Sequence, residues 1–132
     1  MTVEGKCNCG AVTVTIPSMP DSSVLCHCKN CRASSAGIFS VNLVVHTKDL
    51  TIHNEANTTL YRDTDTDTGN TAVRRFCKTC GSPIVTRVEE DPDTNYVKGG
   101  LFPVGSLPAP GMELFTRNWE QWEKKYGETK CL

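Results

Sequence analysis

The chain has 132 residues, a formal net charge of −1 at pH 7, 38% hydrophobic residues and 22% charged residues. This length suits one hydrophobic core, so we expect a single domain over residues 1–132. The near-neutral charge argues against a nucleic-acid partner, which would require a basic excess. Neither a membrane-spanning segment nor a signal-peptide pattern is visible, so we expect a cytoplasmic protein with no membrane partner.

Short strands dominate the elements that the sequence predicts. Alternating or β-branched segments predict strands, in chain order, at 11–16, 38–45, 50–53, 59–62, 72–76, 83–88 and 96–102. Helical signals are confined to a short turn near 29–35 and to 118–127, where Asn118 would cap a helix and Gly127 would end it. The predicted fold class is therefore mainly β with short helices.

Three connecting segments have a distinctive composition. Residues 63–69 (DTDTDTG) alternate carboxylates as a calcium loop does, but the glycine falls one place late and Arg74 takes the place of the bidentate glutamate. We therefore expect a solvated acidic loop there. Residues 89–95 and 102–111 have the composition of turns and could border a cleft.

Eight cysteines in so short a chain indicate either disulfides or metal ligands. Seven of them stand at chelating intervals: Cys7-x-Cys9, Cys26-x-Cys28-x-x-Cys31 and Cys77-x-x-Cys80. Without a secretion signal the thiols stay reduced, and disulfides between such close neighbours would be strained. The spacing thus predicts zinc.

The economical division of these thiolates keeps each chelating group whole and gives two zinc ions per chain. The two pairs together supply four ligands, which is a closed structural site made of Cys7, Cys9, Cys77 and Cys80. The triplet of Cys26, Cys28 and Cys31 then supplies three ligands and leaves a position for an incoming ligand, as catalytic zinc requires. A soft substrate thiol suits that position.

Another side chain could instead close the triplet site. The candidates are Cys131, His27, His46 and His53. His27 stands between two ligands, so its side chain should point away from the metal if that stretch is extended. Cys131 is penultimate and could be an unpaired thiol.

Four motifs carry a family resemblance: GKCNCGAV at 5–12, CHCKNCR at 26–32, FCKTCGSPI at 76–84 and GGLF at 99–102. In order and internal spacing they resemble the glutathione-dependent formaldehyde-activating enzyme family, which includes centromere protein V. The resemblance implies a zinc-binding β-tent fold. It also implies carbon–sulfur lyase activity, in which glutathione and formaldehyde form S-hydroxymethylglutathione or the reverse, with the structural and second zinc sites divided as above.

The resemblance weakens toward the carboxyl end. Phe102 stands where family members commonly have an aspartate, and Glu113 stands where a histidine would be expected. The expected substrate is therefore a small thiol adduct linked to glutathione, with a larger or more apolar carbon part as one alternative. A non-catalytic zinc-binding scaffold of the same fold is the other alternative.

Several residues are candidates for substrate chemistry. His27 and Glu113 are candidates for moving a proton. Glutathione carries two carboxylates, so the cations in or near the cysteine blocks are candidates for binding it as co-substrate, with Arg32 first and Ser35 as a further contact. These cations are Lys29, Arg32, Arg74, Arg75 and Lys98. Trp119 and Trp122 are expected to be packing residues.

Overall fold

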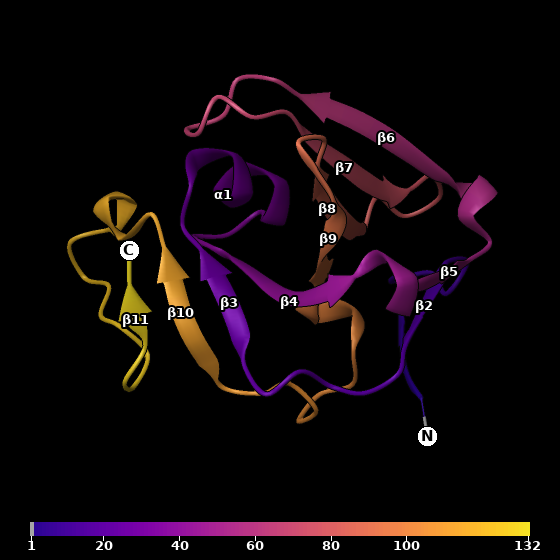
Figure 1. Ribbon diagram of the computed structural model, residues 1–132, viewed down its shortest axis with the longest axis horizontal. Helices are drawn as coiled ribbons and strands as arrows, with labels where there is room; N and C mark the ends of the chain where they lie inside the picture. Colours follow the sequence, from indigo (N-terminus) through magenta and orange to yellow (C-terminus); the bar gives the residue numbers. More distant parts are fainter. Residues whose placement is uncertain (1) are drawn as a thin grey trace.

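The computed structural model describes residues 2–132, so residue 1 of the expected domain lies outside them (Figure 1). No helix in that range is long and apolar enough to cross a bilayer. The strands, in chain order, are β1 (Val3–Lys6), β2 (Thr13–Ile16), β3 (Ser23–Cys26), β4 (Ser40–His46), β5 (Thr51–His53), β6 (Thr58–Asp63), β7 (Ala72–Cys77), β8 (Pro83–Val88), β9 (Asp91–Lys98), β10 (Pro110–Leu114) and β11 (Lys130–Cys131). The helices are α1 (Lys29–Ser35) and the 3₁₀ turns η1 (Thr47–Asp49), η2 (Glu55–Asn57), η3 (Gly99–Leu101) and η4 (Thr116–Asn118).

The strands form two sheets, and the chain is mainly β as the sequence predicts. One sheet is small and antiparallel, with the order β1-β2-β5. The other runs β11-β10-β3-β4-β9-β8-β7-β6, so β11 and β6 lie at its opposite edges (Figure 1). Within it, β10 lies parallel to β3 and to β11, whereas the remaining pairs are antiparallel.

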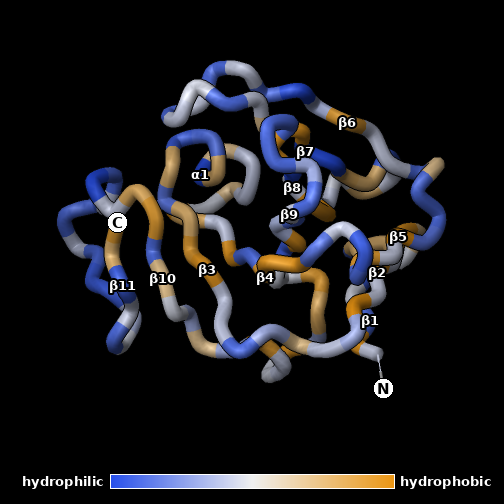
Figure 2. The backbone as a smooth tube through the Cα atoms, in the orientation of Figure 1, coloured by the Kyte–Doolittle hydropathy of each residue, from blue (hydrophilic) through white to orange (hydrophobic). Residues whose placement is uncertain are grey.

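The main hydrophobic core lies between the two sheets. Val12, Val14 and Ile16 contribute from the β2 region, and they pack with Leu43 and Val97 of the large sheet. Figure 2 shows the hydrophobic residues along β2, β4 and β5, whereas the loop between β6 and β7 is mostly hydrophilic. The β-branched residues in these strands suit such a half-buried pleated surface.

The opposite face of the large sheet carries Cys26 and its neighbours across the strands, because side chains alternate between the two faces of a strand. Cys26 of β3 is paired with Ser40 of β4, and Asn42 two residues on is paired with Lys98 of β9. Farther across the sheet, Thr86 of β8 is paired with Tyr96 and Arg74. The register thus places these residues on one continuous face.

The prediction of a helix at 118–127 is wrong. The structure has the turn η4 there, followed by non-helical turns. Tertiary hydrogen bonds hold this segment open, because Arg32 donates to the Asn118 carbonyl oxygen and Trp119 donates to His27. A helix of this length is marginal without packing along one face. Trp119 is partly buried as expected, but Trp122 is 70% exposed and is no packing residue.

Strand boundaries differ in several places from those predicted. The sequence missed β1, β3, β10 and β11, and the predicted strand at 96–102 ends at Lys98, where η3 begins. Most of the turn predicted at 89–95 belongs to β9. Each of these four strands has only two to five residues, which is too short to show a clear alternating pattern in the sequence.

Candidate metal centres and adjoining cavity

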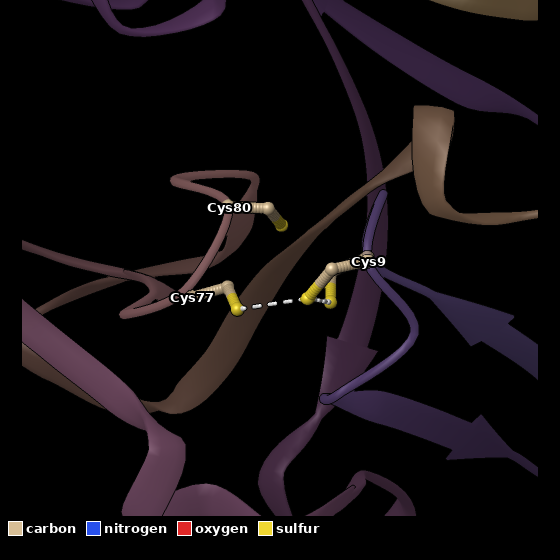
Figure 3. Close-up of side chains that lie close together, drawn as sticks. Cys9, Cys77 and Cys80 are labelled. Atoms are coloured by element: carbon tan, nitrogen blue, oxygen red, sulfur yellow. Dashed lines mark hydrogen bonds between the residues drawn. The ribbon is translucent and has the colours of Figure 1, made fainter.

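Four cysteines converge from two distant turns. Cys7 and Cys9 lie between β1 and β2, and Cys77 and Cys80 lie at the turn from β7 to β8. Their four sulfur atoms lie within 4.8 Å of one another, with Cys9 Sγ 3.7 Å from Cys7 Sγ and 3.8 Å from Cys77 Sγ (Figure 3). Zinc–sulfur bonds of about 2.3 Å place the sulfurs of a tetrahedron ~3.8 Å apart. The residues therefore fit a zinc ion.

The local backbone holds these four thiols in place. Cys7 Sγ accepts a hydrogen bond from Val12 N at 3.3 Å, and the Gly81 N–H donates to the Cys77 carbonyl oxygen at 2.9 Å. Gly81 has a φ of 77°, which glycine adopts without steric cost. Hydrogen bonding with Ser82 lowers the pKa of Cys80 to about 5, which favours the thiolate that metal binding requires.

The second cluster lies at the junction of β3 and α1. Cys26 ends β3, Cys28 caps the amino terminus of α1, and Cys31 lies in its first turn. Their sulfurs lie within 4.8 Å of one another, and all three residues are buried. Hydrogen bonding with Cys28 and Cys31, together with burial, raises the pKa of Cys26. Soft sulfur donors in this arrangement fit a zinc ion.

The chain supplies three ligands to this second cluster. Across residues 2–132, no histidine, aspartate, glutamate or further cysteine joins the triplet within 4.8 Å. His46 Nδ1 accepts a hydrogen bond from Lys48 N, and His53 Nε2 is bonded to Thr15 Oγ1. Cys131 is exposed in the carboxyl-terminal segment. The four residues that could have closed the site therefore lie elsewhere, including His27, described below.

A cavity of about 340 Å³ opens beside the triplet, and all three cysteines line it. Its other lining residues come from β3, α1, β4, β7, β8, β9, β10 and the residue that follows β10, and from the loop after β6. They are Val24, Asn30, Asn42, Thr66, Asp67, Thr68, Asn70, Ala72, Arg74, Thr86, Val88, Tyr96, Lys98, Leu114 and Phe115. A small molecule in this cavity would therefore lie against the triplet.

Two cations line this cavity. Arg74 Nη1 lies 4.0 Å from Cys31 Sγ and 3.3 Å from Ser34 Oγ, while Arg74 Nε donates to Asp63 at 2.9 Å. Lys98 Nζ donates to Asn42 Oδ1 at 2.6 Å. Burial lowers the pKa of Lys98 to about 8, although the neighbouring thiols oppose this shift. Both cations can therefore contact a substrate that reaches the triplet.

The acidic segment 63–69 differs from the expected solvated loop at its first residue. Asp63 is buried, ends β6 and accepts hydrogen bonds from Arg74 and Asn30. The remaining acidic side chains of this segment, Asp65 and Asp67, form ion pairs with Lys29 and Arg117. The alternating carboxylates thus serve as partners for cations of the protein.

Two buried polar atoms of the cavity lining have no hydrogen-bond partner within the described chain. They are Thr86 Oγ1 and Asn30 Oδ1. Buried hydroxyl and amide groups without a partner cost free energy, so a ligand group that bonds to them would recover it. The sequence analysis missed Thr86, because a threonine at an alternating strand position carries no functional signal by itself.

A larger groove, of about 860 Å³, lies next to this cavity. Its lining includes Lys6, Cys7, Ser34 and Ser35, together with Phe102, Pro103 and Val104 of the segment after η3. The expectation that residues 102–111 border a cleft is therefore correct at its first residues. Lys98 lines both spaces and a third, smaller cavity of about 280 Å³, so it marks the point where they meet.

The predicted glutathione contacts lie in different places. Ser35 lines the larger groove. Arg32 lies 2.8 Å from Glu120 Oε1, and Lys29 is an exposed side chain 3.5 Å from Asp65. Neither cation lines the described cavities. The structure thus brings Ser35, Arg74, Arg75 and Lys98 to the described cavities, but neither Lys29 nor Arg32, the cation that the sequence favoured.

His27 and Glu113 lie together behind the triplet, in a buried polar network. His27 Nε2 lies 2.9 Å from Glu113 Oε1, and the two residues are 1% and 0% exposed. Glu113 Oε2 accepts hydrogen bonds from Thr129 Oγ1 and Tyr126 N. The side chain of His27 points away from the cavity, as the alternation between Cys26 and Cys28 predicts, and neither residue lines it.

Comparison with known proteins gives agreement in sequence and in fold. The family model described as glutathione-dependent formaldehyde-activating enzyme matches residues 2–118. A protein of Halomonas elongata, named as a candidate glutathione-dependent formaldehyde-activating enzyme, is 30% identical over 86 residues, which are 64% of this chain. The match spans about half of that relative's length (55%).

A crystal structure of a Rhodobacter sphaeroides protein has a similar fold. The TM-score is 0.61 with 23% sequence identity, over 80% of this chain and 98% of that one. This likeness concerns the fold, whereas the family match rests on sequence over most of the chain. The chain belongs to the glutathione-dependent formaldehyde-activating enzyme family.

Proposed function

We propose that the chain is a zinc-dependent carbon–sulfur lyase that forms or cleaves a glutathione-linked thiol adduct. One observation carries the proposal: three buried cysteines with no fourth protein ligand in residues 2–132 open directly onto a ligand-sized cavity. A site that served structure alone would be closed by four ligands, as the other cluster is. Family membership supports glutathione as the thiol.

Two zinc ions per chain are part of this proposal. Cys7, Cys9, Cys77 and Cys80 would hold the structural ion, and Cys26, Cys28 and Cys31 would hold the second. When bound at the triplet, zinc would supply Lewis acidity that stabilises sulfur as an anion.

Besides the thiolate ligands, the reaction requires groups that stabilise the oxygen of the carbonyl component. In the forward direction the sulfur of glutathione forms a bond to a carbonyl carbon, the thiol proton is lost, and the carbonyl oxygen gains a proton. Lys98 has three N–H donors and gives one to Asn42, so it can hold the oxygen on which negative charge develops. Arg74 lies beside Cys31 and can contribute to the same stabilisation.

We place the peptide part of glutathione in the larger groove. Lys98 lines both the groove and the triplet cavity, and Lys6 also lines the groove, so two cations are available for the two carboxylates. Ser35 can add a hydrogen bond. Arg32 and Lys29 already have carboxylate partners within the protein, so they are weaker candidates for this role.

The proposed activity is tested by adding the protein to an equilibrium mixture of glutathione and formaldehyde. Exchange spectroscopy by NMR measures how fast the free and adduct forms interconvert. We expect the zinc-loaded protein to accelerate this exchange above the spontaneous rate, and Cys28→Ser to abolish the acceleration. Cys131→Ser is the matched control, because this exposed cysteine belongs to neither cluster.

Two further readouts separate the outcomes. Metal content and circular dichroism of Cys28→Ser show whether the fold and the first ion remain. Equal exchange rates with and without the parent protein would reject the lyase and favour a non-catalytic zinc scaffold. In that case, cobalt-substituted protein would also show no spectral change on addition of glutathione.

A further inference from the structure

The cavity beside the triplet is larger than formaldehyde requires. Its volume is about 340 Å³. The hydroxymethyl group of the formaldehyde adduct has two non-hydrogen atoms, which occupy on the order of 60 Å³ if each takes the ~30 Å³ share of a water molecule. If the peptide part lies in the neighbouring groove, most of this cavity remains for the carbon part of the substrate.

One wall of the cavity is apolar. Val24 and Leu114 lie at neighbouring positions of β3 and β10, since Leu114 is paired with Cys26 and Val24 precedes Cys26 by two residues. Ala72 and Val88, which are paired with each other, extend apolar surface on β7 and β8. Such surface gains free energy when an apolar group covers it.

Phe115 adds an aromatic side chain to this wall. It packs with Leu114 against the three cysteines and lines the cavity. Its backbone lies in the left-handed region, with φ 58° and ψ 43°, which is unusual for a bulky side chain and costs of order 1 kcal/mol or more. Strained residues of this kind persist where the surrounding structure holds them, often at ligand sites.

Several contacts hold Phe115 in this conformation. The following residue donates its N–H to the Leu132 carbonyl oxygen at 3.0 Å, and Asn118 N donates to the Phe115 carbonyl oxygen at 3.0 Å. The guanidinium of Arg117 lies 5.0 Å from the ring centroid. Arg117 also reaches Asp67, a residue of the cavity lining, at 3.5 Å. The ring is therefore fixed beside the triplet before any ligand arrives.

Another part of the cavity lining is polar. Lys98, Arg74 and the unpartnered Thr86 Oγ1 lie on β9, β7 and β8, in the middle of the sheet face. They suit the oxygen of an adduct, as described above. The cavity thus combines cations and a free hydroxyl group with an apolar wall.

We propose that the carbonyl component of the adduct is an aldehyde with an apolar substituent larger than hydrogen, and that Phe115 determines this preference. This inference rests on the proposed function, because it takes the adduct to be glutathione-linked. The sulfur lies at the triplet, the oxygen faces Lys98 and Thr86, and the substituent packs against Phe115 and its apolar neighbours.

The test uses stable thioethers that imitate the two kinds of adduct. S-methylglutathione represents the formaldehyde adduct, and S-benzylglutathione represents that of an aromatic aldehyde. Their dissociation constants for the zinc-loaded protein are measured by titration calorimetry, together with that of glutathione. We expect the benzyl compound to bind more tightly than the methyl compound by about tenfold or more, given the apolar area of a phenyl ring.

Variants then assign the preference to the ring. Phe115→Ala keeps a side chain at the same positive φ, so it removes the ring without relieving the backbone. We expect it to reduce the benzyl preference to about threefold or less while glutathione still binds. Trp122→Ala is the control, since this exposed aromatic lies on the same segment and lines none of the three cavities.

The outcomes distinguish the two proposals. Equal binding of the methyl and benzyl compounds to the parent protein would overturn this inference. That measurement requires no variant. A benzyl preference that survives in Phe115→Ala, or in Phe115→Leu if the alanine variant does not fold, would overturn the role of Phe115. Failure of glutathione and both thioethers to bind would instead reject the proposed function.

Discussion

The two cysteine clusters use the same ligand atom in opposite settings. The four-cysteine cluster joins the turn after β1 to the turn after β7, so it fastens the small sheet to the large one. The three-cysteine cluster lies within a short stretch, from β3 into α1, and opens onto a cavity. One cluster thus ties distant parts of the chain together, and the other places three neighbouring cysteines beside a cavity.

This difference shows that sequence separation between ligands indicates what a metal site contributes. A site that joins residues about seventy positions apart converts its binding free energy into folding free energy, because those residues are far apart in the unfolded chain. The triplet is local, and the β3–α1 junction brings its thiols together. Losing the second ion should therefore cost chemistry before it costs the fold.

Removing one cysteine from each cluster is the strongest test of the difference between them. Cys77→Ser should leave the chain largely unfolded, since structural zinc contributes on the order of 10 kcal/mol, as much as the whole stability of a typical domain. Cys28→Ser should retain the β fold and lose one of two metal ions. Circular dichroism and metal analysis on the purified variants measure both effects. If the two variants melt alike, the division into a structural and a reactive site is wrong.

A second substitution tests the buried ion pair beside the triplet. Arg74→Leu removes the cation from a buried pair and leaves the Asp63 carboxylate to Asn30 alone. We expect a loss of about 3 kcal/mol in the free energy of unfolding, measured by urea denaturation. Arg75→Leu is the matched control on the next residue, where the partner Glu55 is exposed, and it should cost less than about 1 kcal/mol. Equal losses would show that Arg74 has no special place beside the thiols.

The smallest expected effect lies behind the triplet. Glu113→Gln keeps the shape of the side chain but removes the charge that accepts hydrogen bonds from Thr129 and Tyr126. We expect a loss of about 2 kcal/mol in the free energy of unfolding, with both metal ions retained. Glu120→Gln, at a partly exposed pair with Arg32, should change the free energy of unfolding by less than about 1 kcal/mol. Loss of the second ion in Glu113→Gln would mean that this network also positions the triplet.

Local patterns in the sequence predicted much of the site. The chelating intervals alone divided the cysteines into the two groups that the structure brings together, because a metal ion requires its ligands at fixed short distances. Alternation correctly turned His27 away from the cavity. The prediction of a helix at 118–127 failed, however, because the Asn118 carbonyl oxygen and the Trp119 side chain bond to Arg32 and His27, which lie about ninety residues earlier.

The sequence by itself determined the mainly β character and the grouping of the thiols, since both follow from residue types at short spacing. Tertiary structure alone decided which residues surround the triplet. Lys98, Arg74, Thr86 and Phe115 come from four separate segments, and the register of β7, β8 and β9 and the return of the chain along β10 bring them together. A cavity wall built from long-range strand pairing leaves no periodic signal in the chain, because each segment contributes only one or two residues to it.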